Sequence, residues 1–200
     1  DRTSRGLGDV YKRQLFRRGK MIIGVPKEIK QSEYRVGITP STASRLINEN
    51  HTVLVQKNSS DGIGATDDEY TKVGVKVVDG PEEIFRNSDM IVKVKEPQEP
   101  EWKMLREDQI IFTYLHLAAD PKQAKGLIDA KCHAIAYETI TDSKGALPLL
   151  APMSEIAGRL AVFEGAYHLK KTCGGPGSLI SGVPGVKPAK VIILGGGMVG

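Results

Sequence analysis

The 200-residue sequence is poor in features that mark several specialised classes of protein. Its two cysteines, Cys132 and Cys173, belong to no Cys-x-x-Cys or Cys/His spacing, so neither a disulfide framework nor a metal site is indicated. No apolar run approaches the ~18 residues of a membrane-spanning helix. Reduced thiols, no expected membrane partner and 40% hydrophobic residues favour a cytoplasmic globular protein.

The excess of positive charge is confined to the start of the chain. Residues 1–20 carry a net charge of +5 and the whole chain +4, so residues 21–200 carry −1. This near-neutral body gives no electrostatic indication of a nucleic-acid partner. Residues 1–20 begin without Met and have neither helical nor strand periodicity. We interpret them as a non-native or disordered leader rather than an Arg-rich transit peptide.

From Met21 onward, short β-branched runs alternate with amphipathic stretches. This rhythm predicts an α/β domain over residues 21–150, with a mostly parallel sheet flanked by helices on both faces, as in Rossmann-like folds. Thr39 or Ser41 can cap one helix, and Thr66 can cap another that Gly74 closes. The expected strands are 22–25, 53–56, 75–78, 90–94, 110–115 and 133–137, and the expected helices include 40–50, 81–87 and 121–130.

The pattern changes after Leu150. Residues 153–171 predict one long helix, residues 174–188 a Gly/Pro-rich loop, and residues 191–194 a buried strand that leads into the sequence GGGMVG. In a dinucleotide-binding turn, Gly195 allows the tight turn, Gly197 the approach of a pyrophosphate, and Gly200 close helix–strand packing. A glycine-rich turn without a ligand fits this motif equally well. We interpret residues 151–200 as a connecting helix and the start of a truncated nucleotide-binding Rossmann domain.

Seven segments in order resemble the alanine dehydrogenases, and the resemblance covers Met21–Gly200 almost without a break. The segments are IGVPKEIKQSEYRVGITP, IVKVKEPQEPE, FTYLHLAA, IAYETI, ALPLLAPMSEIAGRLA, GAYHLKKT and GVPGVKPAKVIILGGGMVG. The resemblance implies reversible, NAD-dependent oxidative deamination of L-alanine to pyruvate and ammonium. It also implies a homohexamer whose catalytic domain is completed by a later part of the chain. The 200 residues alone are therefore expected to be inactive.

The resemblance assigns three residues to the substrate. Arg35 matches the family's substrate-binding arginine, and a planar guanidinium can hold a carboxylate through two hydrogen bonds. Lys95 matches a second substrate contact, although Lys93 lies on the same face of a regular strand and spacing alone does not distinguish the two. His116 matches the catalytic histidine, and an imidazole can exchange protons near neutral pH. Without the resemblance, a solvated arginine, an exposed lysine and a core histidine would explain these residues.

The remaining candidates concern the cofactor NAD and the pocket wall. Ser154 can cap the long helix, and the resemblance also places it against the cofactor together with the three glycines of the turn. Glu138 and Met153 are expected to line or support the pocket. Two rival functions are the NAD-binding subunit of a proton-translocating transhydrogenase, disfavoured by His116, and a non-catalytic carboxylate-binding module. A structural or interaction protein would leave the order of the motifs unexplained.

Overall fold

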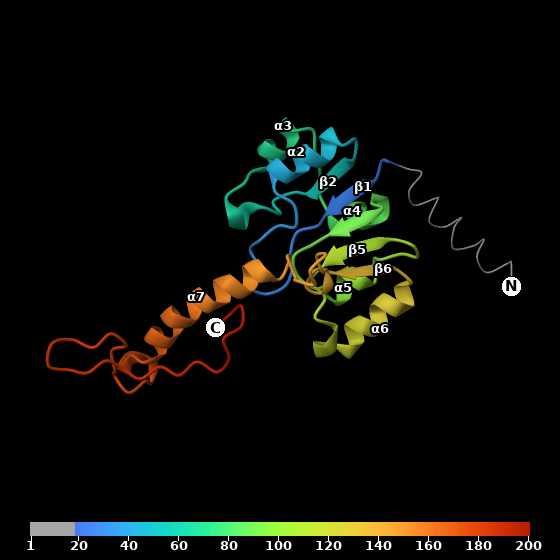
Figure 1. The fold of residues 1–200 in the computed structure, drawn as a ribbon. Coiled ribbons are helices and arrows are strands. Elements are labelled where there is room, and N and C mark those ends of the chain that lie inside the picture. The colour runs from blue at the N-terminus through green and yellow to red at the C-terminus, as the bar shows by residue number, and fades with distance from the viewer. Residues whose placement is uncertain (1–18) are drawn as a thin grey trace, which may run out of the picture. The chain divides into compact units, whose positions relative to one another are not determined.

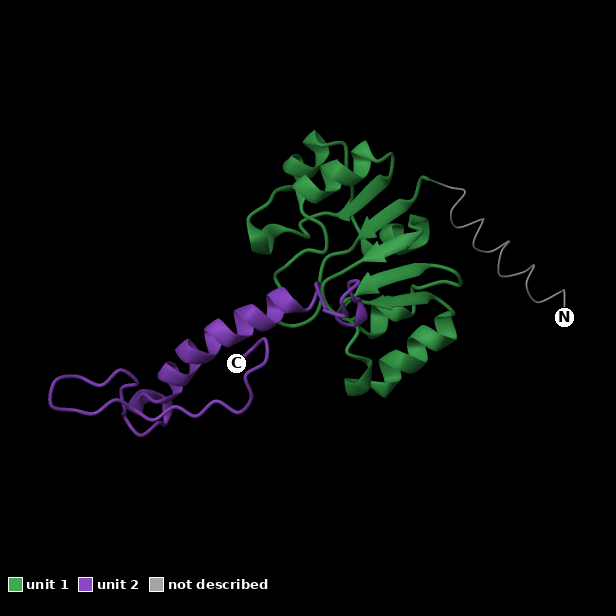
Figure 2. Cartoon of the chain, in the orientation of Figure 1, with its two compact units in different colours: residues 1–137 green, residues 138–200 purple. Residues whose placement is uncertain are grey.

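The computed structural model describes residues 19–200, and its contacts divide the chain into two compact units, residues 1–137 and residues 138–200 (Figure 2). The leader expected over residues 1–20 lies outside the described residues, except for Gly19 and Lys20. The expected division into a substrate domain over 21–150 and a nucleotide-binding segment over 151–200 stays a prediction.

The first unit is built on a sheet of six parallel strands in the order β3-β2-β1-β4-β5-β6 (Figure 1). This arrangement confirms the predicted α/β fold class with a parallel sheet and flanking helices. The strands are β1 (Ile22–Val25), β2 (Thr52–Gln56), β3 (Lys76–Val78), β4 (Met90–Val92), β5 (Ile110–Thr113) and β6 (His133–Ala136). The helices are α2 (Pro40–Asn48), α3 (Asp67–Lys72), α4 (Pro81–Asn87), α5 (Glu99–Trp102) and α6 (Pro121–Ala130), with short 3₁₀ turns between them.

Two hydrophobic cores lie on the two faces of the sheet, because successive side chains of a strand point to opposite faces. In β2, Val53 and Val55 join the core that includes Tyr70 of α3, whereas Leu54 joins the core that includes Phe85 of α4. Helices α2 and α3 therefore cover one face, and α4 and α6 cover the other. Because helices cover both faces, the loops lie at the two ends of the strands.

The predicted helix caps form in the first unit. The Thr39 hydroxyl accepts a hydrogen bond from the backbone N–H of Thr42 at the start of α2. Thr66 and Glu69 form a reciprocal capping box at the start of α3, which satisfies amides that have no partner inside the helix. Gly74 follows α3 with a φ of 92°, in the left-handed region that favours glycine. These local signals fix where α2 and α3 begin.

The strands β4 and β5 are shorter than the predicted ranges 90–94 and 110–115. The N–H of Val94 donates a hydrogen bond of 2.6 Å to the Glu28 carboxylate instead of to a neighbouring strand. This side-chain acceptor, supplied by the loop after β1, ends the regular ladder two residues early. The backbone after β4 is thereby tied to the backbone after β1.

The strand order reverses direction at the centre of the sheet. From β1 the chain proceeds outward through β2 and β3, and it then returns to the other side of β1 to form β4, β5 and β6 (Figure 1). In doubly wound sheets, ligands bind outside the carboxyl ends of the strands at such a switch point. The loops after β1 and β4 are therefore the places to look for a site.

The second unit contains the predicted long helix, α7 (Ala151–His168), but not the predicted strand at residues 191–194. Ile192 and Leu194 are 74% and 95% exposed, and no strand among residues 19–200 pairs with this segment. A β-branched run becomes a buried strand only where neighbouring strands satisfy its backbone groups. The prediction of a buried strand is therefore wrong for the described chain.

Ser154 does not cap α7, contrary to the sequence prediction. The helix begins at Ala151, its N-cap position is Leu150, and no side chain caps it. Pro152 fits the first turn of a helix, where its missing N–H needs no partner, so the helix extends past the serine toward the N-terminus. Among residues 19–200, no helix has the length and apolar character needed to cross a bilayer.

Candidate functional site

The three predicted substrate residues follow three adjacent strands of the first unit. Arg35 lies in the loop after β1, Lys95 follows β4, and His116 follows β5, and these strands are neighbours in the sheet. Because parallel strands end at the same edge, all three residues lie along one edge, beside the switch point. The structure therefore brings together residues that are up to 81 positions apart in the sequence.

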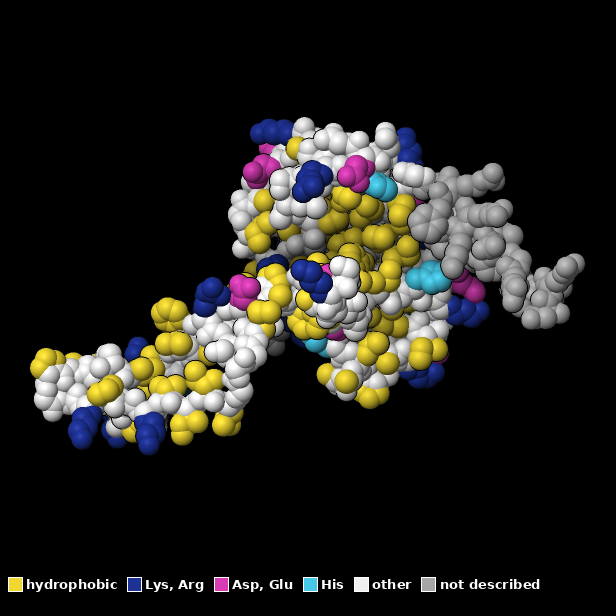
Figure 3. Space-filling view, in the orientation of Figure 1, with side chains coloured by type: hydrophobic (Ala, Val, Ile, Leu, Met, Phe, Trp, Pro, Cys, Tyr) yellow, Lys and Arg dark blue, Asp and Glu magenta, His cyan; other side chains and the backbone are white. Residues whose placement is uncertain are grey.

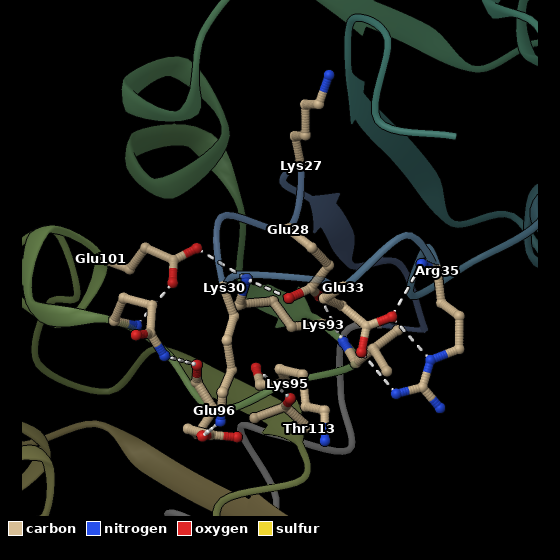
Figure 4. Close-up of polar contacts among 12 residues, drawn as sticks. Lys27, Glu28, Lys30, Glu33, Arg35, Lys93, Lys95, Glu96, Glu101 and Thr113 are labelled. Carbon is tan, nitrogen blue, oxygen red and sulfur yellow. Dashed lines mark hydrogen bonds and ion pairs between the residues drawn. The ribbon is translucent and has the colours of Figure 1, made fainter. Parts of the chain in front are cut away.

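Arg35 is held by a carboxylate two residues earlier. Its Nε and Nη2 donate hydrogen bonds of 2.8 Å and 2.6 Å to Glu33, and its backbone N–H donates a third (Figure 4). These hydrogen bonds, with a smaller contribution from the charge of Lys95, lower the pKa of Glu33 to about 2. The charges of both predicted substrate cations, Arg35 and Lys95, thus stabilise the ionised form of Glu33. Together the three groups carry a net charge of +1.

Lys93 and Lys95 have different environments. The Lys93 ammonium is 1% exposed and lies 3.0 Å from Glu28 and 2.8 Å from Glu101, between the two carboxylates (Figure 4). Lys95 is partly exposed, and the Thr113 hydroxyl donates a hydrogen bond to its carbonyl oxygen. Since Lys93 is committed to two buried carboxylates, the environment favours Lys95 as the lysine that can meet a ligand.

The cluster of Glu28, Lys93 and Glu101 joins three segments beneath this edge. Glu28 comes from the loop after β1, Lys93 from the end of β4, and Glu101 from α5. Burial raises the pKa of Glu101, and this effect outweighs the opposing attraction of Lys93. Two carboxylates around one ammonium carry a net charge of −1 in a nearly solvent-free position. The cluster fixes the backbones that carry Arg35 and Lys95.

His116 has an unusual backbone and a charged neighbour. Its φ of 47° and ψ of 39° place it in the left-handed region, which a residue other than glycine adopts at some energetic cost. Its Nδ1 lies 3.3 Å from an oxygen of Glu96, and its ring stacks with Tyr114 at a centroid distance of 5.9 Å. Tyr114 in turn is among the groups that raise the pKa of Arg35, after the hydrogen bond that Arg35 donates to Glu33. Tyr114 therefore connects the surroundings of Arg35 and His116.

A cavity of about 250 Å³ lies beside Arg35, between the loop after β1 and the segment after β2. Its lining includes Glu33, Tyr34, Arg35, Asn58 and Ser59. The volume is below the ~300 Å³ at which most ligand pockets begin, so it suits only a small molecule. No group of three or more His, Cys, Asp or Glu side chains suited to a metal ion occurs in the part of the chain that the structure describes.

The cofactor candidates lie in the second unit. Gly195 has a φ of 97°, and a Cβ atom at Gly200 would lie 2.2 Å from the Gly195 carbonyl oxygen, so both positions require glycine. A Cβ at Gly197 would meet nothing within 4 Å, which leaves room for a ligand close to the backbone. Met153 and Ser154 lie in the first turn of α7, and Glu138 begins the unit. No strand leads into the glycine turn, and its role in binding a cofactor stays a prediction.

The fold and the first unit's edge define a doubly wound α/β protein with a cationic candidate site at the switch point. Residues 24–157 match the family model described as "Alanine dehydrogenase/PNT, N-terminal domain", and residues 161–200 match the corresponding C-terminal domain. The chain belongs to this alanine dehydrogenase/PNT family.

Individual relatives agree with this assignment. The chain is 49% identical over 180 residues to an alanine dehydrogenase from Methanococcus maripaludis, covering 90% of this chain and 48% of that protein. A solved L-alanine dehydrogenase has a TM-score of 0.81 and 48% identity, covering 90% of this chain and 49% of its own. A transhydrogenase from Sinorhizobium meliloti shares the fold at a TM-score of 0.65 and 22% identity, covering 74% and 44%. The chain thus spans about half the length of the curated relatives it matches.

Sequence reasoning missed the carboxylates that accompany the cations. Glu33 precedes Arg35 by two residues and Glu96 directly follows Lys95, so both were visible beside the predicted residues. A motif readily identifies a residue that binds a substrate. It does not identify the side chain that pairs with this residue, because the pairing depends on how loops approach each other. The Glu28–Lys93–Glu101 cluster had no local signal at all.

Proposed function

We propose that this chain is part of an oxidoreductase that converts L-alanine reversibly to pyruvate and ammonium with NAD. The observation that carries the proposal is the position of Arg35, Lys95 and His116 along one edge of the sheet, after three adjacent strands. A guanidinium, an ammonium and an imidazole suit a substrate with one carboxylate and one carbon at which a proton must move.

Binding and orientation of the substrate fall to the two cations. Arg35 carries three hydrogen bonds to Glu33 and is 43% exposed, so Glu33 holds its guanidinium while part of it faces outward. The outward part is suited to the substrate carboxylate, and Lys95 to the keto oxygen or the same carboxylate. Fixing the substrate in this way removes much of the entropic barrier to a reaction with a second molecule.

Proton movement falls to His116. Oxidative deamination requires water to add to an imine and ammonia to leave, and both steps need a group that takes and returns a proton. An imidazole at the end of β5, 46% exposed, is accessible for this purpose. The side chain of Glu96 lies beside its Nδ1, so the Nε2 atom is the one suited to the substrate.

The cofactor would be held by the glycine turn Gly195–Gly200 and by Ser154. Bound NAD would supply the acceptor for hydride from the substrate. The open space around Gly197 supports the approach of a pyrophosphate. Glu138 and Met153 remain candidates for supporting the same pocket. We further propose a cytoplasmic homo-oligomer, a hexamer by resemblance, and the free thiols Cys132 and Cys173 are compatible with a reducing compartment.

A transhydrogenase subunit is the second candidate, and the shared family model supports it. Such a protein moves hydride between nucleotides and needs no acid–base residue for a small substrate. The environment of His116 and the 49% identity to an alanine dehydrogenase favour the first proposal. A non-catalytic carboxylate-binding module would require Arg35 and Lys95 but give no role to His116.

The proposal predicts the behaviour of two variants of a full-length protein that carries this chain. His116→Ala should lower kcat for alanine oxidation by about 100-fold or more because the proton-transfer group is lost. Arg35→Lys should raise KM for pyruvate about tenfold, which is the effect of losing roughly one charge-assisted hydrogen bond. NADH absorbance gives both constants: NADH formed from alanine gives kcat, and NADH consumed with pyruvate and ammonium gives KM for pyruvate.

Lys103→Met serves as a control, because Lys103 forms an exposed pair with Glu99, in which none of the three residues takes part. Its kinetic constants should match those of the original protein. A His116→Ala variant with normal kcat would remove the histidine from the reaction. No NADH from alanine in the unaltered full-length protein would refute the proposed function itself.

A further inference from the structure

Glu96 lies between two charged or titratable side chains from two other loops. One oxygen accepts a hydrogen bond from the Lys30 ammonium, in the loop after β1, and the other lies 3.3 Å from Nδ1 of His116, after β5. The Glu96 side chain is 13% exposed and the His116 side chain 46% exposed. The sheltered Glu96 carboxylate thus lies between two more exposed side chains, Lys30 and His116.

The state of Glu96 decides which atom of the histidine carries a proton. Partial burial would raise the pKa of Glu96, but the hydrogen bonds from Lys30, the backbone and His116 outweigh burial, so the net pKa is lowered. An ionised carboxylate has no proton to donate and can only accept hydrogen bonds. A contact between this carboxylate and Nδ1 is favourable only if Nδ1 carries a proton. A neutral imidazole with a proton on Nδ1 has its lone pair on Nε2.

Two further features hold the ring in place. The left-handed backbone of His116 fixes the direction in which the side chain leaves the chain, and the Tyr114 ring stacks at an interplanar angle of 18°. Two titratable side chains therefore meet the ring, Glu96 at Nδ1 and Tyr114 on its face, whereas Lys30 contacts Glu96 alone. The contact of Glu96 with Nδ1 distinguishes the two neutral forms of the ring.

We propose that Glu96 is a positioning residue that holds His116 in the form protonated on Nδ1, leaving Nε2 as the atom that takes up and returns the substrate's proton. This inference deepens the proposed function and rests on it for the role of Nε2. The contact with Nδ1 itself rests on the geometry alone. Lys30 contributes by keeping Glu96 ionised, and it touches neither the ring nor the substrate in this scheme.

Nitrogen NMR of the four histidine rings in the 200-residue chain tests the positioning step without any catalysis. At a pH where the rings are neutral, His116 should show the signature of a proton on Nδ1, and His116→Asn identifies its signals. In Glu96→Ala the fraction protonated on Nδ1 should fall several-fold, because a neutral histidine in water prefers the proton on Nε2. In Glu96→Gln, which keeps the side chain's shape, the fraction should fall by less.

A second histidine–carboxylate pair in the same unit provides the matched control. His133 lies 3.6 Å from Asp108, and both side chains are more than half exposed. Asp108→Ala should change only the His133 signals, and Glu96→Ala only those of His116. Unchanged His116 signals in both Glu96 variants would overturn the proposal. Altered signals of every histidine would indicate unfolding of Glu96→Ala, and Glu96→Gln would then decide the question.

Activity separates this inference from the proposed function. In an active full-length protein, Glu96→Ala should lower kcat at least about tenfold and leave KM for alanine nearly unchanged, because Glu96 does not meet the substrate. If the unaltered protein shows the Nδ1 signature but no activity with alanine, the proposed function is refuted, whereas the proposed pairing of His116 with Glu96 still stands. An active protein whose Glu96 variants keep full kcat would refute the role of the pair in the reaction.

Discussion

Lys93 is a residue whose charge matters more for folding than for binding. Its ammonium is 1% exposed and lies between two carboxylates that are themselves 3% exposed. Removing one member of a buried ion pair leaves an uncompensated charge, which typically costs about 3–5 kcal/mol. We therefore expect Lys93→Met to lower the free energy of unfolding by about that amount, measured by urea unfolding at neutral pH.

Two comparison variants show whether the loss comes from charge. Lys103→Met removes an exposed ammonium from an exposed pair and should change stability by less than about 1 kcal/mol. Adding Glu28→Gln and Glu101→Gln to Lys93→Met removes the stranded carboxylates and should recover part of the loss. If Lys93→Met is as mild as Lys103→Met, the three buried groups do not act as an ion cluster.

Glu33 should make stability depend on pH in acid. Its pKa is 4.5 in a free side chain and about 2 in the folded protein, mainly because Arg35 donates hydrogen bonds to it. A lowered folded-state pKa contributes stability that is present above about 4.5 and disappears as the pH falls toward about 2. Glu33→Gln should therefore flatten the dependence of unfolding free energy on pH within that window.

Urea unfolding at a series of pH values tests the effect of Glu33. The control is Glu107→Gln, which removes an exposed carboxylate 3.4 Å from Lys131. Because exposed pairs contribute little, this variant should keep the slope of the original chain. Equal slopes for Glu33→Gln and the original chain would mean that Glu33 and Arg35 are not paired in solution.

At the scale of helices and strands, the sequence predicted the features that depend on residues close together in the chain. Thr39 and Thr66 lie directly before helical stretches, and β-branched runs gave β1 and β2 nearly to the residue. The strand β4 ended early because Glu28, 66 positions away, captures the N–H of Val94. A strand was expected at 191–194 from its local pattern, but strands also require partners, which no local pattern supplies.

In the candidate site, too, some features could be predicted from the sequence and others could not. Arg35, Lys95 and His116 were identified by motifs, and the roles assigned to them stay predictions. The order of the strands then explains why residues from three loops lie along one edge. The pairing of Lys30 with Glu96, 66 positions apart, could not be predicted, because it depends on how two loops approach each other. Long-range side-chain pairs are thus the part of the site that only three-dimensional structure supplies.

At the scale of the whole molecule, buried apolar side chains are distributed very unequally between the two units. Among the described residues, those forming the core lie between Ile23 and Leu127, all in the first unit. Helix α7 of the second unit has no buried residue. Figure 3, in the orientation of Figure 1, shows hydrophobic side chains on the surface of this helix. Its exposed side chains include Ile156, Leu160 and Phe163, which are 51%, 51% and 70% exposed. The first unit therefore contains a hydrophobic core of its own.

This distribution predicts that residues 19–137 fold without the second unit. Such a chain keeps all six strands and the ring of Tyr137, which packs against Phe112 and Tyr114 at centroid distances of 4.3 Å and 5.0 Å. Its thermal unfolding, followed by circular dichroism, should stay cooperative and have nearly the same midpoint as the first unit in the 200-residue chain. A shorter chain, residues 19–130, loses β6 and the aromatic contacts, so its midpoint should fall by several degrees. If residues 19–137 unfold gradually or aggregate where the longer chain unfolds sharply, the six-stranded sheet depends on the second unit for its stability.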